Sequence, residues 1–175
     1  MRAREEIDIK ESLENFADGF KAIMGTHKIE FEVVPGPSSF KGLYMNKASF
    51  ESIIINLMSN SIKALGRVDF VNGRRHKKIR IEYKKNLEHL EIRVKDNGSG
   101  IEDSSREEIF KEFWSFPKHK EDAGTGMGTT IIREILADYE GTITVENTVY
   151  EKDDIGKGKT TMLIKIPLSE LKEKK

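Results

Sequence analysis

The most informative stretch of this 175-residue sequence reads Asn56-Leu-Met-Ser-Asn60-Ser-Ile-Lys63. It lies in an apolar segment, from about residue 46 to about residue 65, whose spacing predicts one long, mostly buried helix. With Asn56 placed at 0° and about 100° added per residue, Asn60 lies at about 40° and Lys63 at about 340°. Two amides and one amine therefore share a narrow polar strip on an otherwise apolar helix.

The polar strip has two interpretations that the helix alone does not distinguish. Either the strip simply meets water, or it faces a binding site. An amide oxygen can ligate Mg²⁺, which keeps several waters and also accepts phosphate oxygens as ligands. An ammonium group on the same face would contact phosphate as a mobile point charge.

A short glycine loop, Asp96-Asn-Gly98-Ser-Gly100, directly follows an alternating strand. Its glycines let the backbone turn sharply and approach a ligand closely. A carboxylate held in such a pocket can accept a hydrogen bond from an exocyclic amine such as that of adenine. The alternative is an ordinary strand-to-helix turn with an Asx cap, because this motif by itself is a weak signal.

A second glycine loop, Gly124-Thr-Gly126-Met-Gly128, leads into another apolar segment with helical spacing. Such a loop points backbone N–H groups and the positive end of the helix dipole outward, which suits phosphate. Its spacing is neither that of a Walker loop nor that of a dinucleotide-binding fingerprint. A flexible linker is the alternative, and the apolar helix directly behind the loop argues against it.

The rest of the chain alternates between predicted strands and helices, with hairpins among them. Helices are expected from Leu13 to Met24, from about residue 107 to 114 and from about residue 128 to 139. Strands are expected at about residues 29–33, 79–83, 90–94, 142–149 and 160–167. This order predicts an α/β fold, a two-layer sandwich whose mixed β-sheet is covered by helices on one face.

Composition restricts the classes of function. Lys and Arg number 30, as do Asp and Glu, so the formal net charge is zero, which argues against nucleic acid as a partner. The absence of cysteine excludes disulfides, thiolate zinc sites and a cysteine nucleophile. No apolar run approaches the roughly 18 residues of a membrane span, and no signal-peptide core is present.

We therefore expect a single cytoplasmic domain over residues 1–175 that makes no membrane contact itself, which leaves room for a membrane anchor elsewhere in a parent protein. Residues 1–6 are a candidate stub of an upstream helical domain, and residues 168–175 form a polar tail.

Together, these motifs resemble the ATP-binding domain of the GHKL superfamily in its histidine-kinase branch, which has a Bergerat-type fold. The Asn56–Lys63 stretch is similar to that family's asparagine box, and the two glycine loops are similar to its two glycine boxes. Ile109–Trp114 resembles the phenylalanine box, and Gly158–Thr161, before a strand ending at Pro167, resembles the closing threonine motif. Five weak motifs in the family's order make the resemblance specific over nearly the whole chain.

The resemblance implies that the chain binds ATP or ADP with Mg²⁺. At the phosphate end, Asn60 would ligate Mg²⁺, Asn56 would support the metal or phosphate shell, and Lys63 would contact phosphate. The second glycine loop would form a lid over the nucleotide. The lid residues assigned to the nucleotide are Gly124, Thr125, Gly126, Met127 and Gly128.

At the adenine end, the resemblance implies that Asp96 accepts a hydrogen bond from the amino group and that Thr161 supports it from the neighbouring strand. Gly98 and Gly100 would admit the nucleotide. Two positions depart from the usual family residues, because Met127 stands in place of Leu and Thr129 in place of an aliphatic residue.

The residue at position 56 distinguishes the branches of the resembled family. The hydrolysing branches (gyrase, mismatch-repair and chaperone ATPases) resemble one another in carrying a glutamate general base there. The neutral amide of Asn56 cannot accept the proton. We therefore expect the chain to hold ATP and to donate its γ-phosphoryl group to a histidine on a separate dimerisation domain, with a response regulator as an indirect partner.

Two other functions stay open. One is a self-contained GHKL-type ATPase that drives conformational change in a larger protein, and the other is a non-catalytic nucleotide-sensing module. None of the four histidines lies in a long amphipathic helix beside an acidic residue. The phosphoacceptor histidine is therefore expected outside this chain.

Overall fold

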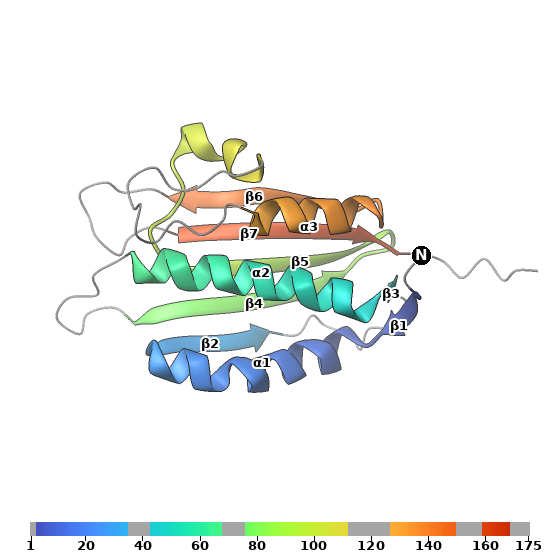
Figure 1. The fold of residues 1–175 in the computed structure, drawn as a ribbon, viewed down its shortest axis with the longest axis horizontal. Helices are drawn as coiled ribbons and strands as arrows, with labels where there is room; N and C mark the ends of the chain where they lie inside the picture. Colours follow the sequence, from blue (N-terminus) through green and yellow to red (C-terminus); the bar gives the residue numbers. More distant parts are fainter. Residues whose placement is uncertain (1–2, 35–42, 68–75, 112–126, 150–158, 169–175) are drawn as a thin grey trace, which may run out of the picture.

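The computed structural model describes residues 3–34, 43–67, 76–111, 127–149 and 159–168. One sheet has five strands, here in spatial order: β2 (Ile29–Val34), β4 (Lys77–Lys85), β5 (His89–Asp96), β7 (Lys159–Pro167) and β6 (Thr142–Val149). β2 and β4 are parallel, and the other neighbouring pairs are antiparallel. The sheet is therefore mixed (Figure 1).

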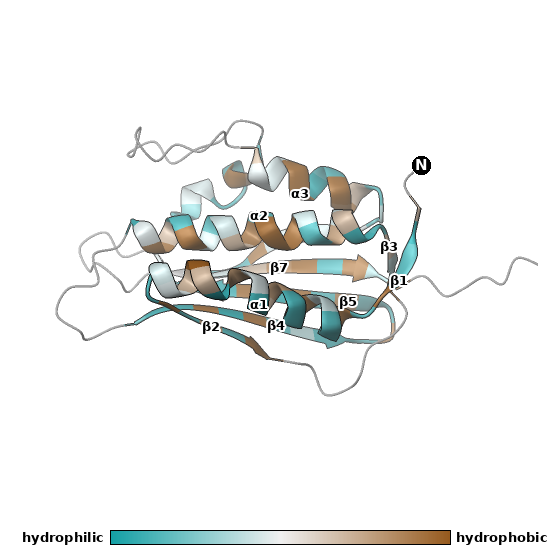
Figure 2. Ribbon diagram, turned by 60° about the horizontal axis from the view of Figure 1, so that its bottom comes forward, coloured by the Kyte–Doolittle hydropathy of each residue, from teal (hydrophilic) through white to brown (hydrophobic). Residues whose placement is uncertain are grey.

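The α-helices of the described residues all lie on one face of this sheet (Figures 1 and 2). They are α1 (Ile9–Thr26), α2 (Lys47–Gly66) and α3 (Gly128–Ala137). α2 lies over the middle of the sheet, between α1 on the β2 side and α3 on the β6 side. This arrangement confirms the predicted α/β sandwich, and no helix in the described part is both long and apolar enough to cross a membrane.

Helix α2 is held in place by a cap and by the core. The side-chain oxygen of Asn46 accepts a hydrogen bond from the Ser49 backbone N–H at 3.1 Å, which satisfies a donor of the first turn. Phe50, Ile53 and Leu57 are fully buried against the sheet, and each side chain of this size contributes about 1.5–3 kcal/mol on burial. This packing fixes the direction in which the polar strip of α2 points.

The segment before the second glycine loop is not the predicted helix over residues 107–114. Two 3₁₀ turns are present instead, η2 (Asp103–Ser105) and η3 (Glu108–Phe110), and residues 112–114 lie outside the described residues. The carbonyls of Ile109 and Phe110 accept hydrogen bonds from the side chains of Thr129 and Arg133 on α3, so tertiary contacts use acceptors that a regular helix would offer to later N–H groups.

A second, two-stranded sheet pairs β1 (Glu5–Ile7) with β3 (Leu43–Met45) in antiparallel fashion. The sequence did not predict β3, because three residues are too few for an alternating pattern to show. The last residues of the candidate N-terminal stub thus belong to a strand. Residues 169–175 of the polar tail lie outside the described residues.

A ring of contacts ties the N-terminal segment to the ends of α2 and α3. Arg4 lies over the Tyr139 ring, 4.7 Å from its centroid, and donates a hydrogen bond to the Asp138 carbonyl at 3.0 Å. The Tyr139 hydroxyl accepts a hydrogen bond from the Asn46 backbone N–H at 2.9 Å, and the Asn46 side chain donates one to the Ala3 carbonyl at 3.1 Å. These contacts fix the C-terminal end of α3.

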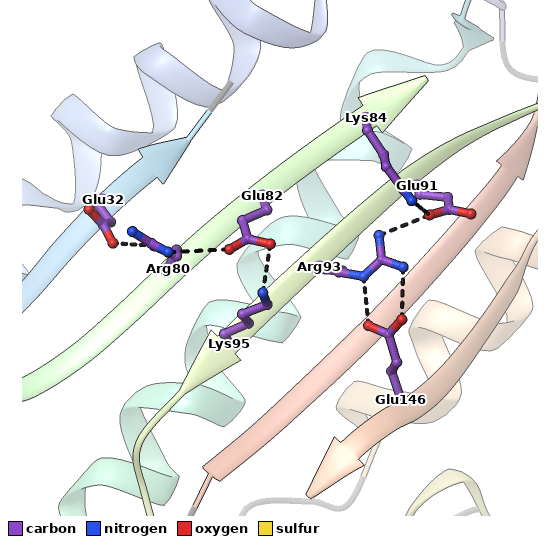
Figure 3. Close-up of polar contacts among 8 residues, drawn as sticks. All are labelled: Glu32, Arg80, Glu82, Lys84, Glu91, Arg93, Lys95 and Glu146. Atoms are coloured by element: carbon purple, nitrogen blue, oxygen red, sulfur yellow. Dashed lines mark hydrogen bonds and ion pairs between the residues drawn. The ribbon is translucent and has the colours of Figure 1, made fainter. Parts of the chain in front are cut away.

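The face of the sheet opposite the helices carries charged side chains in pairs (Figure 3). Arg93 on β5 forms two hydrogen bonds with Glu146 on β6, at 2.6 and 2.8 Å, and one with Glu91 at 2.8 Å. Pairing raises the pKa of Arg93 and lowers the pKa of Glu146. A second set of ion pairs on this face links Glu32, Arg80, Glu82 and Lys95.

Candidate nucleotide-binding site

The first part of the candidate site is the polar strip of α2. Asn56 and Asn60 are half-buried there, and Lys63 is exposed. The Asn56 amide nitrogen donates a hydrogen bond to the Ser52 carbonyl at 2.8 Å, which leaves its oxygen to point away from the helix. The structure thus keeps both asparagine side chains on one side of α2, as the helical spacing predicted.

The start of α3 lies against these two asparagines. A methyl group on Gly128 would be 3.2 Å from the Asn56 side-chain oxygen and 3.6 Å from the Asn60 side-chain oxygen. Met127, directly before the helix, is 43% exposed. Gly124, Thr125 and Gly126 lie outside the described residues, and Gly128, the last residue of the second glycine loop, lies at the strip.

The second part of the site is a buried carboxylate at the end of β5. Asp96 is 8% exposed and accepts hydrogen bonds from the Ser61 hydroxyl at 3.1 Å and the Gly98 N–H at 3.0 Å. Burial raises the pKa of Asp96 to about 6, and these two hydrogen bonds offset part of the increase. No charged neighbour among the described residues contributes to this shift, so the described part of the fold offers this carboxylate hydrogen-bond donors and no cation.

The loop after Asp96 touches the C-terminal half of α2. A methyl group on Gly98 would lie 2.7 Å from the Ala64 carbonyl carbon, a distance at which one group must move. The next residue, Ser99, donates its backbone N–H to the Ala64 carbonyl at 3.1 Å. Only glycine therefore fits at position 98, and the reason is the close approach of α2.

The end of the same loop is fixed to β6. Gly100 has a φ of 74°, a left-handed conformation that favours glycine. Ile101 donates its N–H to the Thr148 hydroxyl at 2.9 Å, and this hydroxyl in turn donates to the Ile101 carbonyl at 3.3 Å. The loop is thus held between α2 on one side and β6 on the other.

The strand register changes which threonine lies beside Asp96. Thr160 is the partner of Asp96 between β7 and β5, whereas Thr161 is the partner of Lys95. Because successive side chains point to opposite faces of a sheet, Thr160 shares the covered face with Asp96 and Thr161 faces the other way. The supporting role that the resemblance gave to Thr161 therefore fits Thr160, which is 4% exposed.

Ser61 is a second site residue that was not among the residues predicted for the site. Its position on the helix, at about 140° from Asn56, lies within the apolar sector. A hydroxyl there is a signal in itself, because a buried polar group requires a partner. That partner is Asp96, so α2 contributes to both ends of the site.

The chain matches the model of a protein family described as "Histidine kinase-, DNA gyrase B-, and HSP90-like ATPase" over residues 45–170. It belongs to this family, whose domain implies ATP binding. Among its relatives, the C4-dicarboxylate transport sensor protein DctB of Rhizobium meliloti is 37% identical over 102 residues, 58% of this chain and 15% of DctB. The sensor histidine kinase YvrG of Bacillus subtilis is 30% identical over 104 residues, 59% of this chain and 17% of YvrG.

Solved structures show the same fold. The catalytic domain of histidine kinase ThkA superposes with a TM-score of 0.73 at 20% identity, covering 95% of this chain and 99% of that domain. ThkA in complex with the response regulator protein TrrA superposes with a TM-score of 0.70 at 20% identity, covering 95% of this chain and 42% of ThkA. The chain therefore spans nearly all of the catalytic domain of ThkA, but the matched region covers less than a fifth of the length of DctB and YvrG.

Proposed function

We propose that this chain is the catalytic ATP-binding domain of a sensor histidine kinase. It binds Mg-ATP and donates the γ-phosphoryl group to a histidine on a separate phosphoacceptor domain. The observation that carries the choice of a kinase is Asn56, which lies beside the start of α3 at the position of the glutamate base in hydrolysing relatives. The sensor histidine kinases among the relatives support the same choice.

At the adenine end, Asp96 accepts a hydrogen bond from the exocyclic amine of the base. A buried carboxylate needs hydrogen-bond donors, and among the described residues it has those of Ser61 and Gly98. Thr160 replaces Thr161 as the supporting residue on the neighbouring strand. Gly98 and Gly100 shape the loop that borders the base.

At the phosphate end, the oxygen of Asn60 binds Mg²⁺, and Asn56 orients the phosphates beside it. The described residues contain no cluster of three or more acidic or histidine side chains that could hold a metal. A hard ion held by one or two side-chain oxygens completes its shell with water and phosphate oxygens, which fits this donor set. The bound Mg²⁺ would neutralise phosphate charge.

The exposed amine of Lys63 contacts phosphate from the same strip. The second glycine loop, from Gly124 through Thr125, Gly126 and Met127 to Gly128, offers backbone N–H groups to the phosphates. Catalysis in this proposal consists of positioning and charge neutralisation, because the neutral amide of Asn56 cannot accept a proton from water.

The proposed partners come from the relatives. ThkA forms a complex with the response regulator protein TrrA, and by similarity a response regulator receives the phosphoryl group after the phosphoacceptor histidine. Residues 1–175 act as one cytoplasmic domain in this proposal, and a parent protein supplies the phosphoacceptor domain and any membrane anchor.

The test combines calorimetry of Mg-ATP binding with an assay of free phosphate in the same sample. Tight binding with negligible phosphate release is expected. Asn56→Glu, which restores a carboxylate, should increase phosphate release, whereas the neutral and equally long Asn56→Gln should not. Steady release by the wild-type chain that disappears in Asp96→Asn would overturn the kinase proposal in favour of an autonomous ATPase.

A further inference from the structure

We propose that Thr129 is a positioning residue for the phosphate end of the site. Its hydroxyl fixes the start of α3 against η3 and so holds Gly128 over Asn56 and Asn60. This inference rests on the proposed function, and it assigns a role to a residue that departs from the aliphatic one usual in the resembled family.

The contact itself joins α3 to the core. The Thr129 hydroxyl donates a hydrogen bond to the Ile109 carbonyl at 2.5 Å. Ile109 is 3% exposed and belongs to the hydrophobic core, so its carbonyl is a fixed acceptor. One turn further along α3, Arg133 donates to the Phe110 carbonyl at 3.1 Å. Two successive carbonyls of η3 thus bind two successive turns of one side of α3.

These contacts hold the helix without occupying its N-terminal donors. A side-chain cap is the usual way to fix a helix start, and it consumes one of the free backbone N–H groups. Met127, at the N-cap position of α3, makes no side-chain cap hydrogen bond. The hydroxyl of Thr129 binds the Ile109 carbonyl instead, so it fixes the start of α3 without using any of the first N–H groups, which could then bind phosphate.

The opposite end of α3 is already fixed by Tyr139 and Arg4. Loss of the Thr129 contact would therefore free the start of the helix selectively. Gly128 would then move relative to the side-chain oxygens of Asn56 and Asn60, which lie 3.2 and 3.6 Å from the position of a methyl group added to Gly128. Asp96, bound to α2 and its own loop, would keep its place.

The experiment compares Thr129→Val, which has the same shape but no hydroxyl, with Thr129→Ser, which keeps the hydroxyl. Binding of Mg-ATP and of adenosine is measured by calorimetry for each. Loss of one hydrogen bond predicts that Thr129→Val weakens Mg-ATP binding about five- to tenfold and changes adenosine binding less than about twofold. Thr129→Ser should restore Mg-ATP binding.

If Thr129 had only a structural role, Thr129→Val would weaken the binding of Mg-ATP and of adenosine equally, and that result would overturn the inference. Unchanged Mg-ATP binding would overturn it as well. Because Thr129 is half-buried, Arg133→Gln on the exposed side provides a second variant that should fold, and it should show a smaller loss for Mg-ATP only. If the wild-type chain binds adenosine but not Mg-ATP, or neither, the proposed function fails first and this inference fails with it.

Discussion

The two faces of the five-stranded sheet differ in how they hold charge. On the face away from the helices, Arg93, Glu146 and their neighbours pair with one another across β4, β5 and β6 (Figure 3). On the covered face, Asp96 is buried among apolar strands and helices, and its hydrogen-bond partners are a hydroxyl and an N–H.

This difference separates side chains that serve the fold from one that, in the proposed function, serves a ligand. Pairing lowers the pKa of Glu146 because Arg93 stabilises its charge, whereas burial raises the pKa of Asp96. At neutral pH the charged Glu146 therefore stabilises the fold, whereas the charged Asp96 destabilises it. A residue that destabilises the fold it belongs to is best explained by binding.

The largest effect is expected from Asp96→Asn, which tests this contrast directly. Mg-ATP binding should weaken at least about 100-fold, because the amide of asparagine turns an N–H donor toward the adenine amine or leaves it unpaired. Thermal stability at pH 7 should stay equal or rise, because a buried charge is removed. Calorimetry and a melting curve measure the two, and binding retained by this variant would contradict the assignment of Asp96.

The next effect is a pH dependence of stability. Because the folded-state pKa of Asp96 is about 6 and its ordinary value is 3.8, its contribution to stability is fully present below pH 3.8 and is lost as pH rises through 6. Relative to Asp96→Asn, the wild-type free energy of unfolding should fall by about 3 kcal/mol over this window. Urea unfolding at several pH values measures the difference, and parallel curves for the two proteins would show that the pKa is not raised.

A third prediction concerns the contact between the first glycine loop and α2. Gly98→Ala should lower the free energy of unfolding by about 1–3 kcal/mol, because the added methyl group meets the Ala64 backbone at 2.7 Å. The matched control is Gly19→Ala in α1, where an added methyl group would have no described atom within 4 Å apart from its chain neighbours and its own helix backbone. That control should raise stability by roughly 0.5–1 kcal/mol, and equal effects of the two substitutions would contradict the close approach.

The smallest effect is expected on the charged face. Glu146→Gln should lower the free energy of unfolding by less than about 1 kcal/mol, since paired surface charges contribute little, and should leave Mg-ATP binding unchanged. The decrease in the free energy of unfolding caused by this substitution should be smaller in high salt, because salt screens the ion pair between Arg93 and Glu146. A large loss of nucleotide binding here would mean that the two faces are coupled.

Much of the fold and part of the site were predictable because the patterns involved are long. The twenty residues of α2 repeat the helical spacing often enough to place Asn56 and Asn60 on one side. Asp96 was identifiable because it ends an alternating strand and precedes two glycines. In both cases the spacing of residues along the chain is enough to predict where the side chain lies in the folded protein.

The rest depends on pairings between distant segments. The choice between Thr160 and Thr161 rests on strand register, and a shift of one residue exchanges the two faces of a strand. The bond between Thr129 and Ile109 depends on how a 3₁₀ turn meets α3, which the expected helix over residues 107–114 would have placed differently. No local pattern in the sequence encodes either pairing.

The close contact between Gly98 and Ala64 also determines which ligands the proposed site can select. Asn60 and Ser61 are neighbours on α2, and Ser61 binds Asp96 directly. In the proposed function, the carboxylate that accepts from adenine and the amide that ligates Mg²⁺ are thus joined through α2, and the distance between them is set before any ligand arrives. A nucleotide would then be chosen by its length, because one with too few phosphates would reach Asp96 and leave Asn60 with water alone.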